Sequence, residues 1–174
     1  MSVDIERLVV ELTEQVRHRY FGKYRGIVRD VNDPETLGRI VAQVPSVFGD
    51  EDSPWALPAV PFAGASHGLV LLPKPGDGVW IEFEGGDAAR PIWTGCWWGS
   101  GEMPSPGGPE ERTLVTPQGL KVVLDDSGRK LQLVHPGGAE ITLTDTDITL
   151  KVTGAKIVLS AAGISMNDGA YTVR

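Results

Sequence analysis

The last third of the chain repeats a short pattern in which apolar and polar residues alternate. Turn residues such as Gly, Pro, Asp and Thr separate the six copies, which occupy residues 121–124, 130–133, 140–143, 147–150, 156–159 and 163–166. A period of two predicts β-strands with one apolar face. A strand of this length cannot bury that face alone, so the pattern predicts an assembly element built by stacking.

Two architectures fit this repeating tail. A single-chain β-helix would have only about two turns, because each turn takes about three strands, and such a fold has a poor core. Three identical chains that intertwine would instead form a triangular β-prism with the apolar side chains on its axis, and this trimeric β-helix is the better solution. Its predicted core consists of Ile141, Leu143, Ile148, Leu150, Ile157, Leu159, Ile164 and Met166.

The far end of such a prism would expose an unpaired edge strand. The chain runs to Arg174 with no sequence that predicts a folded cap. We therefore expect a separate protein to cover this end, in contact with Tyr171 and Val173.

The rest of the chain predicts a helix followed by a small barrel. Within residues 1–19, apolar residues recur at helical spacing, and Leu8, Leu12 and Val16 form a narrow face that we expect to dock on a neighbouring protein. Over residues 20–98 the period changes to two. Five predicted strands, at 24–31, 39–44, 68–72, 78–83 and 91–98, are separated by Gly and Pro turns, which suggests a closed barrel of the OB type. The predicted barrel core consists of Ile27, Ile40, Val44, Val79, Ile81, Phe83 and Trp93.

Residues 99–110 are rich in Gly, Ser and Pro and predict a linker, which leaves residues 111–174 as the repeating domain. The fold class expected is therefore all-β, with a short N-terminal helix, an OB-fold barrel and an intertwined trimeric β-helix.

Charge is distributed unevenly between these domains. The net charge is −7; residues 21–110 carry 12 acidic and 6 basic side chains, whereas residues 111–174 carry 7 of each. An acidic barrel argues against a partner in duplex DNA or an anionic membrane, since both are bound through Lys and Arg. A neutral tail can stack on copies of itself without repulsion.

The residues that usually carry chemistry are scattered. Cys96 is the single cysteine, and His18, His67 and His135 lie far from it and from one another, so neither a nucleophile with its base nor a metal site is predicted. The acidic run at residues 30–35 resembles a calcium loop, but Pro34 and the lack of a central glycine break that pattern. We expect no enzyme, cofactor or metal. Since the N-terminus lacks a signal peptide, we expect cytoplasmic assembly.

Several longer phrases occur together in a specific order. They are Tyr24-Arg-Gly-Ile-Val, Asp33-Pro-Glu-Thr-Leu-Gly-Arg-Ile40, Trp55-Ala-Leu-Pro, Pro75-Gly-Asp-Gly-Val-Trp-Ile-Glu-Phe83 and Pro91-Ile-Trp-Thr-Gly95. Over nearly the whole chain they resemble the baseplate assembly protein V and Vgr-type spike family of phage tails, type VI secretion systems and extracellular injection systems. The resemblance implies an OB domain and a trimeric needle at the centre of a baseplate, in a tail-like particle.

The resemblance also implies partners. A separate hub protein would contact the N-terminal helix, a PAAR-type tip protein would cap the C-terminal end, and the target membrane would be met only transiently. The function implied is a structural spike that joins hub to tip and transmits force for membrane puncture. The alternative is a trimeric OB-fold module that binds an oligosaccharide or a single-stranded nucleic acid through aromatic residues such as Trp93, Trp97 and Trp98.

Overall fold

The computed structural model describes residues 5, 7–11, 13 and 19–173, which fall into two compact units, Met1–Gly101 and Glu102–Arg174. Each unit is described by itself. The described residues near the N-terminus, 5, 7–11 and 13, are helical, and Leu8 is exposed. Leu12 and Val16, which were predicted to share its face, lie outside the described residues. No helix among the residues described is long and apolar enough to cross a membrane.

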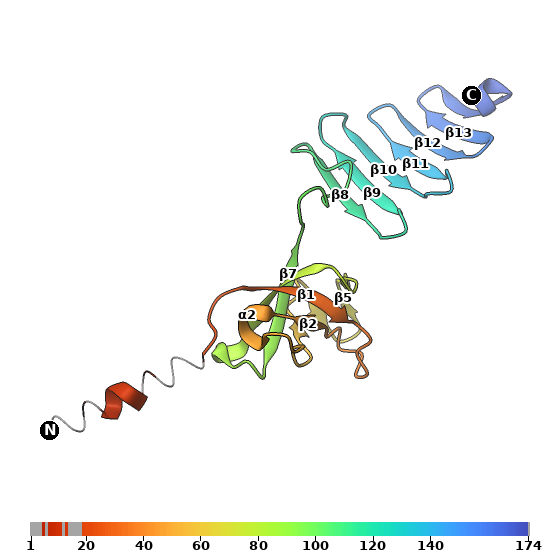
Figure 1. The fold of residues 1–174 in the computed structure, drawn as a ribbon. Helices are drawn as coiled ribbons and strands as arrows, with labels where there is room; N and C mark the ends of the chain where they lie inside the picture. Colours follow the sequence, from red (N-terminus) through yellow and green to blue (C-terminus); the bar gives the residue numbers. More distant parts are fainter. Residues whose placement is uncertain (1–4, 6, 12, 14–18, 174) are drawn as a thin grey trace. The chain divides into compact units, whose positions relative to one another are not determined.

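The N-terminal unit is built on a five-stranded sheet with the order β2-β1-β6-β7-β3. Figure 1 labels three of these strands, β1, β2 and β7. The strands are β1 (Tyr24–Asp30), β2 (Val41–Gln43), β3 (Leu57–Pro58), β6 (Gly78–Phe83) and β7 (Pro91–Trp97). All pairs are antiparallel except β3 with β7. A short helix α2 (Pro45–Phe48) follows β2, and a 3-10 turn η1 (Glu84–Gly86) follows β6.

Isolated bridges join the two ends of this sheet. The backbone of Ile40, next to β2, exchanges two hydrogen bonds with Ala56, next to β3, at 3.1 and 2.8 Å. Ser53 extends the contact, because its N–H donates to the carbonyl of Ala42 while its hydroxyl accepts from the N–H of Ala42. The sheet thereby curls into an OB-type barrel.

The barrel interior holds one cluster of buried side chains. It contains six of the seven residues predicted from the sequence: Ile40, Val44, Val79, Ile81, Phe83 and Trp93. The prediction of Ile27 is wrong, because Ile27 is only half-buried and its neighbour Val28 points into the core instead. Gly26 is the other inward position of β1, and a Cβ there would lie 3.3 Å from side-chain atoms of Ile81 and Val44.

The segment between β3 and β6 differs from the prediction of a strand at 68–72. Only His67–Gly68 (β5) is paired, in a two-stranded hairpin with Ala63–Gly64 (β4). Residues 69–74 form no regular strand, and the side chains of Leu69, Val70, Leu71 and Leu72 are exposed. Short apolar runs favour a strand in sequence patterns, but this one has no partner strand and is followed by Pro73.

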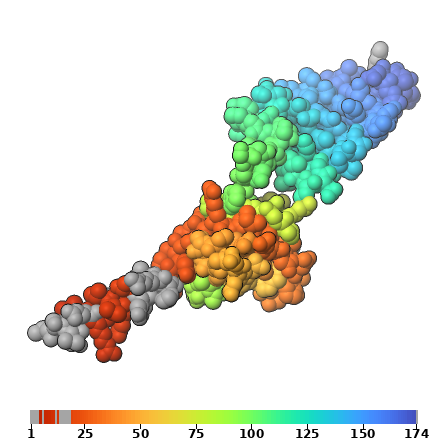
Figure 2. All heavy atoms as spheres, viewed as in Figure 1, coloured from red at the N-terminus to blue at the C-terminus, as the bar shows by residue number. Residues whose placement is uncertain are grey.

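The C-terminal unit is an eight-stranded antiparallel meander, in which each strand pairs with the next along the chain. Its strands follow one another from green to blue in Figure 1, and Figure 2 shows the atoms of this unit in the same colours. Six strands coincide with the repeats: β9 (Lys121–Asp125), β10 (Lys130–Val134), β11 (Glu140–Leu143), β12 (Asp147–Val152), β13 (Ala155–Ser160) and β14 (Gly163–Met166).

Two further strands were not predicted and form the ends of this sheet. They are β8 (Glu111–Val115) and β15 (Tyr171–Val173), the latter preceded by a 3-10 turn η2 (Asn167–Gly169). Ahead of β8, the segment that looked like a linker contacts the sheet, because Lys121 Nζ donates to the carbonyl of Ser105 at 2.8 Å.

Candidate functional site

The register of the C-terminal sheet places its apolar side chains in two straight ladders on one face. In β12, Ile148 lies between Leu143 of β11 and Leu159 of β13, and Leu150 lies between Ile141 and Ile157. The first ladder runs through Leu114, Val122, Leu133, Ile141, Leu150, Ile157, Met166 and Tyr171. The second runs from Arg112 through Leu124, Leu131, Leu143, Ile148, Leu159, Ile164 and Val173.

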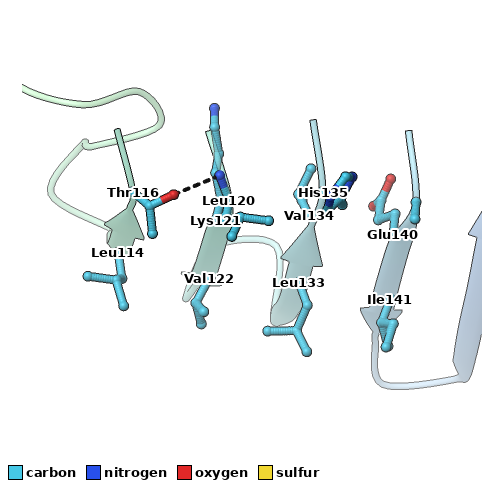
Figure 3. Close-up of a pocket in the computed structure, with 11 residues that line it drawn as sticks. Leu114, Thr116, Leu120, Lys121, Val122, Leu133, Val134, His135, Glu140 and Ile141 are labelled. Atoms are coloured by element: carbon cyan, nitrogen blue, oxygen red, sulfur yellow. Dashed lines mark hydrogen bonds between the residues drawn. The ribbon is translucent and has the colours of Figure 1, made fainter. Parts of the chain in front are cut away.

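We call these two ladders, without Arg112, the apolar face. Ten of its fifteen side chains are exposed in the single chain and the other five are half-buried: Ile141 retains 37% of its accessible surface and Leu159 retains 47%. Near β8 the face is hollowed by a pocket of about 300 Å³, and Figure 3 shows four members of the first ladder in a row along it, Leu114, Val122, Leu133 and Ile141. Burying such large side chains is worth roughly 1.5–3 kcal/mol each, so this exposure is costly.

The opposite face is mostly polar, and several of its side chains hydrogen-bond to one another, although the buried hydroxyl of Thr113 has no hydrogen-bond partner among the residues described. Its central ladder is Thr113, Val123, Gln132, Thr142, Thr149, Val158, Ser165 and Thr172. Glu140 accepts hydrogen bonds from Thr142 Oγ1 at 2.6 Å and from Gln132 Nε2 at 2.5 Å. These contacts, first that from Thr142, lower the pKa of Glu140 and keep it ionised. The polar face is therefore suited to water and the apolar face is not.

All eight residues predicted for the trimer core lie together on the apolar face. The prediction missed seven apolar members of the same ladders: Leu114, Val122, Leu124, Leu131, Leu133, Tyr171 and Val173. The alternation in 121–133 carries the same signal as the later repeats and could have identified four of them. A face of this length, with large exposed apolar side chains in register, marks an interaction surface.

The sheet ends at β15, which leaves one side of this strand without a described partner. Tyr171 and Val173, the predicted contacts of a capping protein, lie on this strand and are exposed at 60% and 45%. Both side chains continue the apolar face, in register with Met166 and Ile164.

The described residues offer no catalytic arrangement. Among them no group of three or more His, Cys, Asp or Glu side chains could hold a metal ion. Burial, with a smaller contribution from Asp77, raises the pKa of the Cys96 thiol, which is the opposite of what a nucleophile needs. What the arrangement supports is association through the apolar face.

Comparison with protein-family models decides the identity. Residues 24–98 match the type VI secretion system/phage-baseplate injector OB domain, and residues 111–172 match the phage baseplate V C-terminal trimerisation domain. The chain belongs to the phage baseplate V family. Together the two matches cover the barrel and the meander from the start of β8 to residue 172. Comparison with curated proteins gives no match.

Membership of the phage baseplate V family bears on the oligomeric state of the chain. The trimerisation match covers residues 111–172, which include every residue of the two ladders except Val173, and it supports a homotrimer. The family consists of structural baseplate and injector proteins and is not an enzyme family.

Proposed function

We propose that this chain is the central spike of a contractile injection machine or phage-like tail. Three copies place their apolar faces inward to form a triangular prism, and each copy contributes one complete eight-stranded wall. The observation that carries the proposal is the exposed apolar face, continuous over all eight strands within the matched trimerisation domain.

Stiffness is the property that such a spike contributes. Every strand of the meander is hydrogen-bonded to its neighbours within its own chain, and the turns between strands are short. With strands about 4.8 Å apart, eight of them span roughly 34 Å. A prism whose backbone bonds and side-chain core are all engaged transmits axial force without bending, and no covalent chemistry is required.

Partners at the two ends complete the proposal. A hub protein would engage the barrel and the helical N-terminal residues, of which Leu8 is exposed. A PAAR-type tip protein would cover β15 and pair with its open edge, where Tyr171 and Val173 are exposed. The assembled particle would meet the target membrane only during puncture.

A ligand-binding role for the barrel has less support. Trp80 and Trp97 hold the guanidinium of Arg25, with its Cζ 5.6 and 5.2 Å from the two ring centroids. Trp93 is buried and donates from Nε1 to the carbonyl of Gly38 at 3.1 Å. These rings are used for packing, so of the three predicted stacking residues only Trp98, which is 63% exposed, offers a free ring for a base or sugar.

Co-purification with a PAAR-type tip protein from the same genome tests the spike role. We expect one tip protein per three chains on size-exclusion chromatography. Val173→Asp places a charge on the apolar side of the last strand and should abolish co-elution. Thr172→Asp is the matched control, because Thr172 lies on the polar face of the same strand. Equal loss with both variants, or no complex with the wild-type chain, would contradict a tip-bearing spike.

A further inference from the structure

An apolar groove opens on the N-terminal unit, away from the trimerisation domain in sequence. It has a volume of about 860 Å³ and lies between the loop at residues 31–38 and the segment at residues 58–72, with Trp93 in its wall. The side chains around it include Leu37, Phe62, Leu69, Val70, Leu71 and Leu72, all of them exposed. Val70 retains 78% of its accessible surface. An exposed apolar patch of this kind marks an interaction site.

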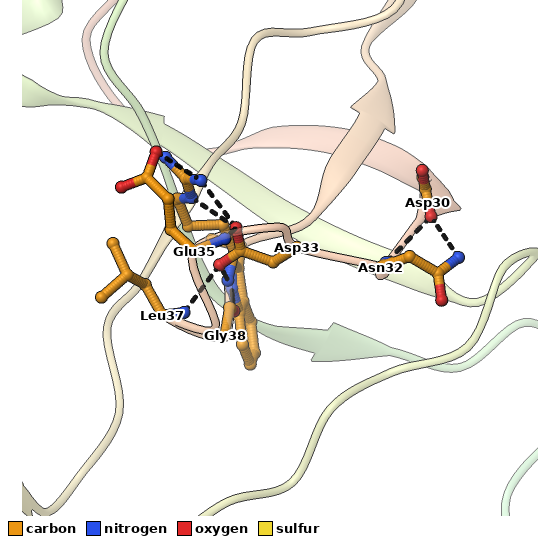
Figure 4. Close-up of polar contacts among 8 residues, drawn as sticks. Asp30, Asn32, Asp33, Glu35, Leu37 and Gly38 are labelled. Carbon is orange, nitrogen blue, oxygen red and sulfur yellow. Dashed lines mark hydrogen bonds and ion pairs between the residues drawn. The ribbon is translucent and has the colours of Figure 1, made fainter.

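The groove is built on a rigid loop. Asp33 accepts hydrogen bonds from the backbone N–H groups of Glu35, Leu37 and Arg39, and its side chain is only 4% exposed although it sits in a surface loop (Figure 4). Arg39 neutralises it through a contact at 2.6 Å. The same loop is tied to the barrel by Trp93, which donates to Gly38. Leu37 is thereby held in a fixed position at the rim.

The other wall of the groove lacks a support of its own. The β4–β5 hairpin forms a separate two-stranded sheet, and all four of its residues are exposed. Phe62 contacts the ring of His67 in a tilted arrangement, with ring centroids 5.2 Å apart. A hairpin of this size is marginal in water unless something packs against it.

The distribution of charge indicates which partner packs against this hairpin. Residues 53–73 contain no Asp, Glu, Lys or Arg, although residues 21–110 as a whole carry 12 acidic and 6 basic side chains. Of the residues lining the groove, Asp33 is the charged one, and it is already paired with Arg39. Because acidic domains repel one another, an uncharged surface of this kind is where two copies meet at the lowest electrostatic cost, whereas a basic partner would use the acidic remainder.

The trimer supplies such copies at high local concentration. Residues 99–110 separate the two matched domains, and 12 residues reach at most about 40 Å. Three barrels tethered to one prism therefore share a small volume, in which effective concentrations are about millimolar. A contact too weak to form between free chains forms under these conditions.

We propose that the apolar groove and the segment at residues 58–72 are a second protomer–protomer interface, in which the barrel of a neighbouring copy in the same trimer packs. This inference rests on the trimer of the proposed function. It assigns the uncharged segment to contacts between barrels, so that the spike is held together at its barrel end as well as along its apolar face.

Site-specific photo-crosslinking tests this contact in the full-length chain. p-Benzoylphenylalanine is introduced at position 70, and a second probe at position 62 covers the case in which the first perturbs the segment. Irradiation should produce covalent dimers and trimers of the chain, with a yield that does not fall on dilution. The matched control is the same probe at position 51, because Glu51 is exposed on the same unit and lies outside the groove lining.

The outcomes separate this inference from its premise when the mass is measured in parallel. A trimeric mass with crosslinks from positions 70 and 62, but not from 51, supports the interface. A trimeric mass without crosslinks from either position would overturn the interface and leave the trimer standing. A mass of 18.7 kDa would overturn the trimer and the interface together.

Discussion

At the scale of single residues, Asp33 shows how strongly one side chain fixes a loop. It accepts from three backbone N–H groups and from Nε and a terminal nitrogen of Arg39, at 2.6–3.2 Å. The guanidinium of Arg39 in turn lies over the ring of Trp55, 5.6 Å from its centroid. The hydrogen bonds from Arg39, followed by those from the backbone, hold the pKa of Asp33 well below its usual range.

This pKa shift predicts a pH dependence of stability. A carboxyl whose pKa is lower in the folded state stabilises the fold above its unfolded pKa of about 3.9, and that contribution is lost as the pH falls further. We expect Asp33→Asn to lower the melting temperature of the N-terminal unit at pH 7. The gap between wild type and variant should narrow below about pH 4, as measured by thermal melting at several pH values. A gap that is constant with pH would contradict the role assigned to the Asp33 charge.

The sequence predicts barrel-core residues correctly in strands where the alternation of apolar and polar residues is unambiguous. Six barrel-core residues follow from alternation in strands flanked by clear turns. Ile27 failed because alternation gives the period and not the phase, and in β1 one inward position is occupied by Gly26, which carries no hydrophobic signal. The Asp33 network could not be predicted either, since its donors are defined by the path of the loop and not by their spacing.

At the scale of elements, the meander joins short apolar patterns from separate strands into one continuous apolar surface. Each strand contributes only two side chains to the apolar face, or one in the case of β8, but the register aligns them over all eight strands. β8 and β15 escaped prediction because neither fits the repeated pattern: β8 has Arg112 where its partner has Leu124, and β15 has only three residues. The sequence predicts a strand at the apolar run 69–72, but the pattern of apolar residues alone does not show whether a pairing partner exists.

A pair of neighbouring substitutions tests which face of β12 is buried in the assembly. Ile148→Asp places a carboxylate between Leu143 and Leu159 on the apolar face, and in a trimer three such charges would share one core, at a cost of several kcal/mol per ion. We expect loss of the trimer and of resistance to heat.

Thr149→Lys is the control, since Thr149 lies one residue away on the polar face and donates to Asp147, so that a charge there faces water and a carboxylate. It should leave both properties close to wild type. Analytical ultracentrifugation and thermal melting would measure them. Trimers that survive Ile148→Asp would show that the apolar face is not the trimer core.

At the scale of the whole molecule, the two units differ in how their apolar side chains become buried. The barrel has a closed core and needs no partner to bury it, whereas the meander has no core within one chain and obtains one only through association. The sequence accounts for this difference. The strands of the barrel are separated by long turns, so the sheet can curl around its own core. The strands of the tail are joined by short turns, so they form a single layer with no second layer of the same chain to cover it. The two family matches agree with this difference, because the injector OB match covers the barrel and the trimerisation match covers the meander.

The mass of the full-length chain in solution tests the central claim most directly. Size-exclusion chromatography with multi-angle light scattering should give three times the chain mass of 18.7 kDa, unchanged over a wide range of concentration. A mass of 18.7 kDa would mean that the apolar face stays uncovered, and it would contradict the account of this protein as a trimeric spike.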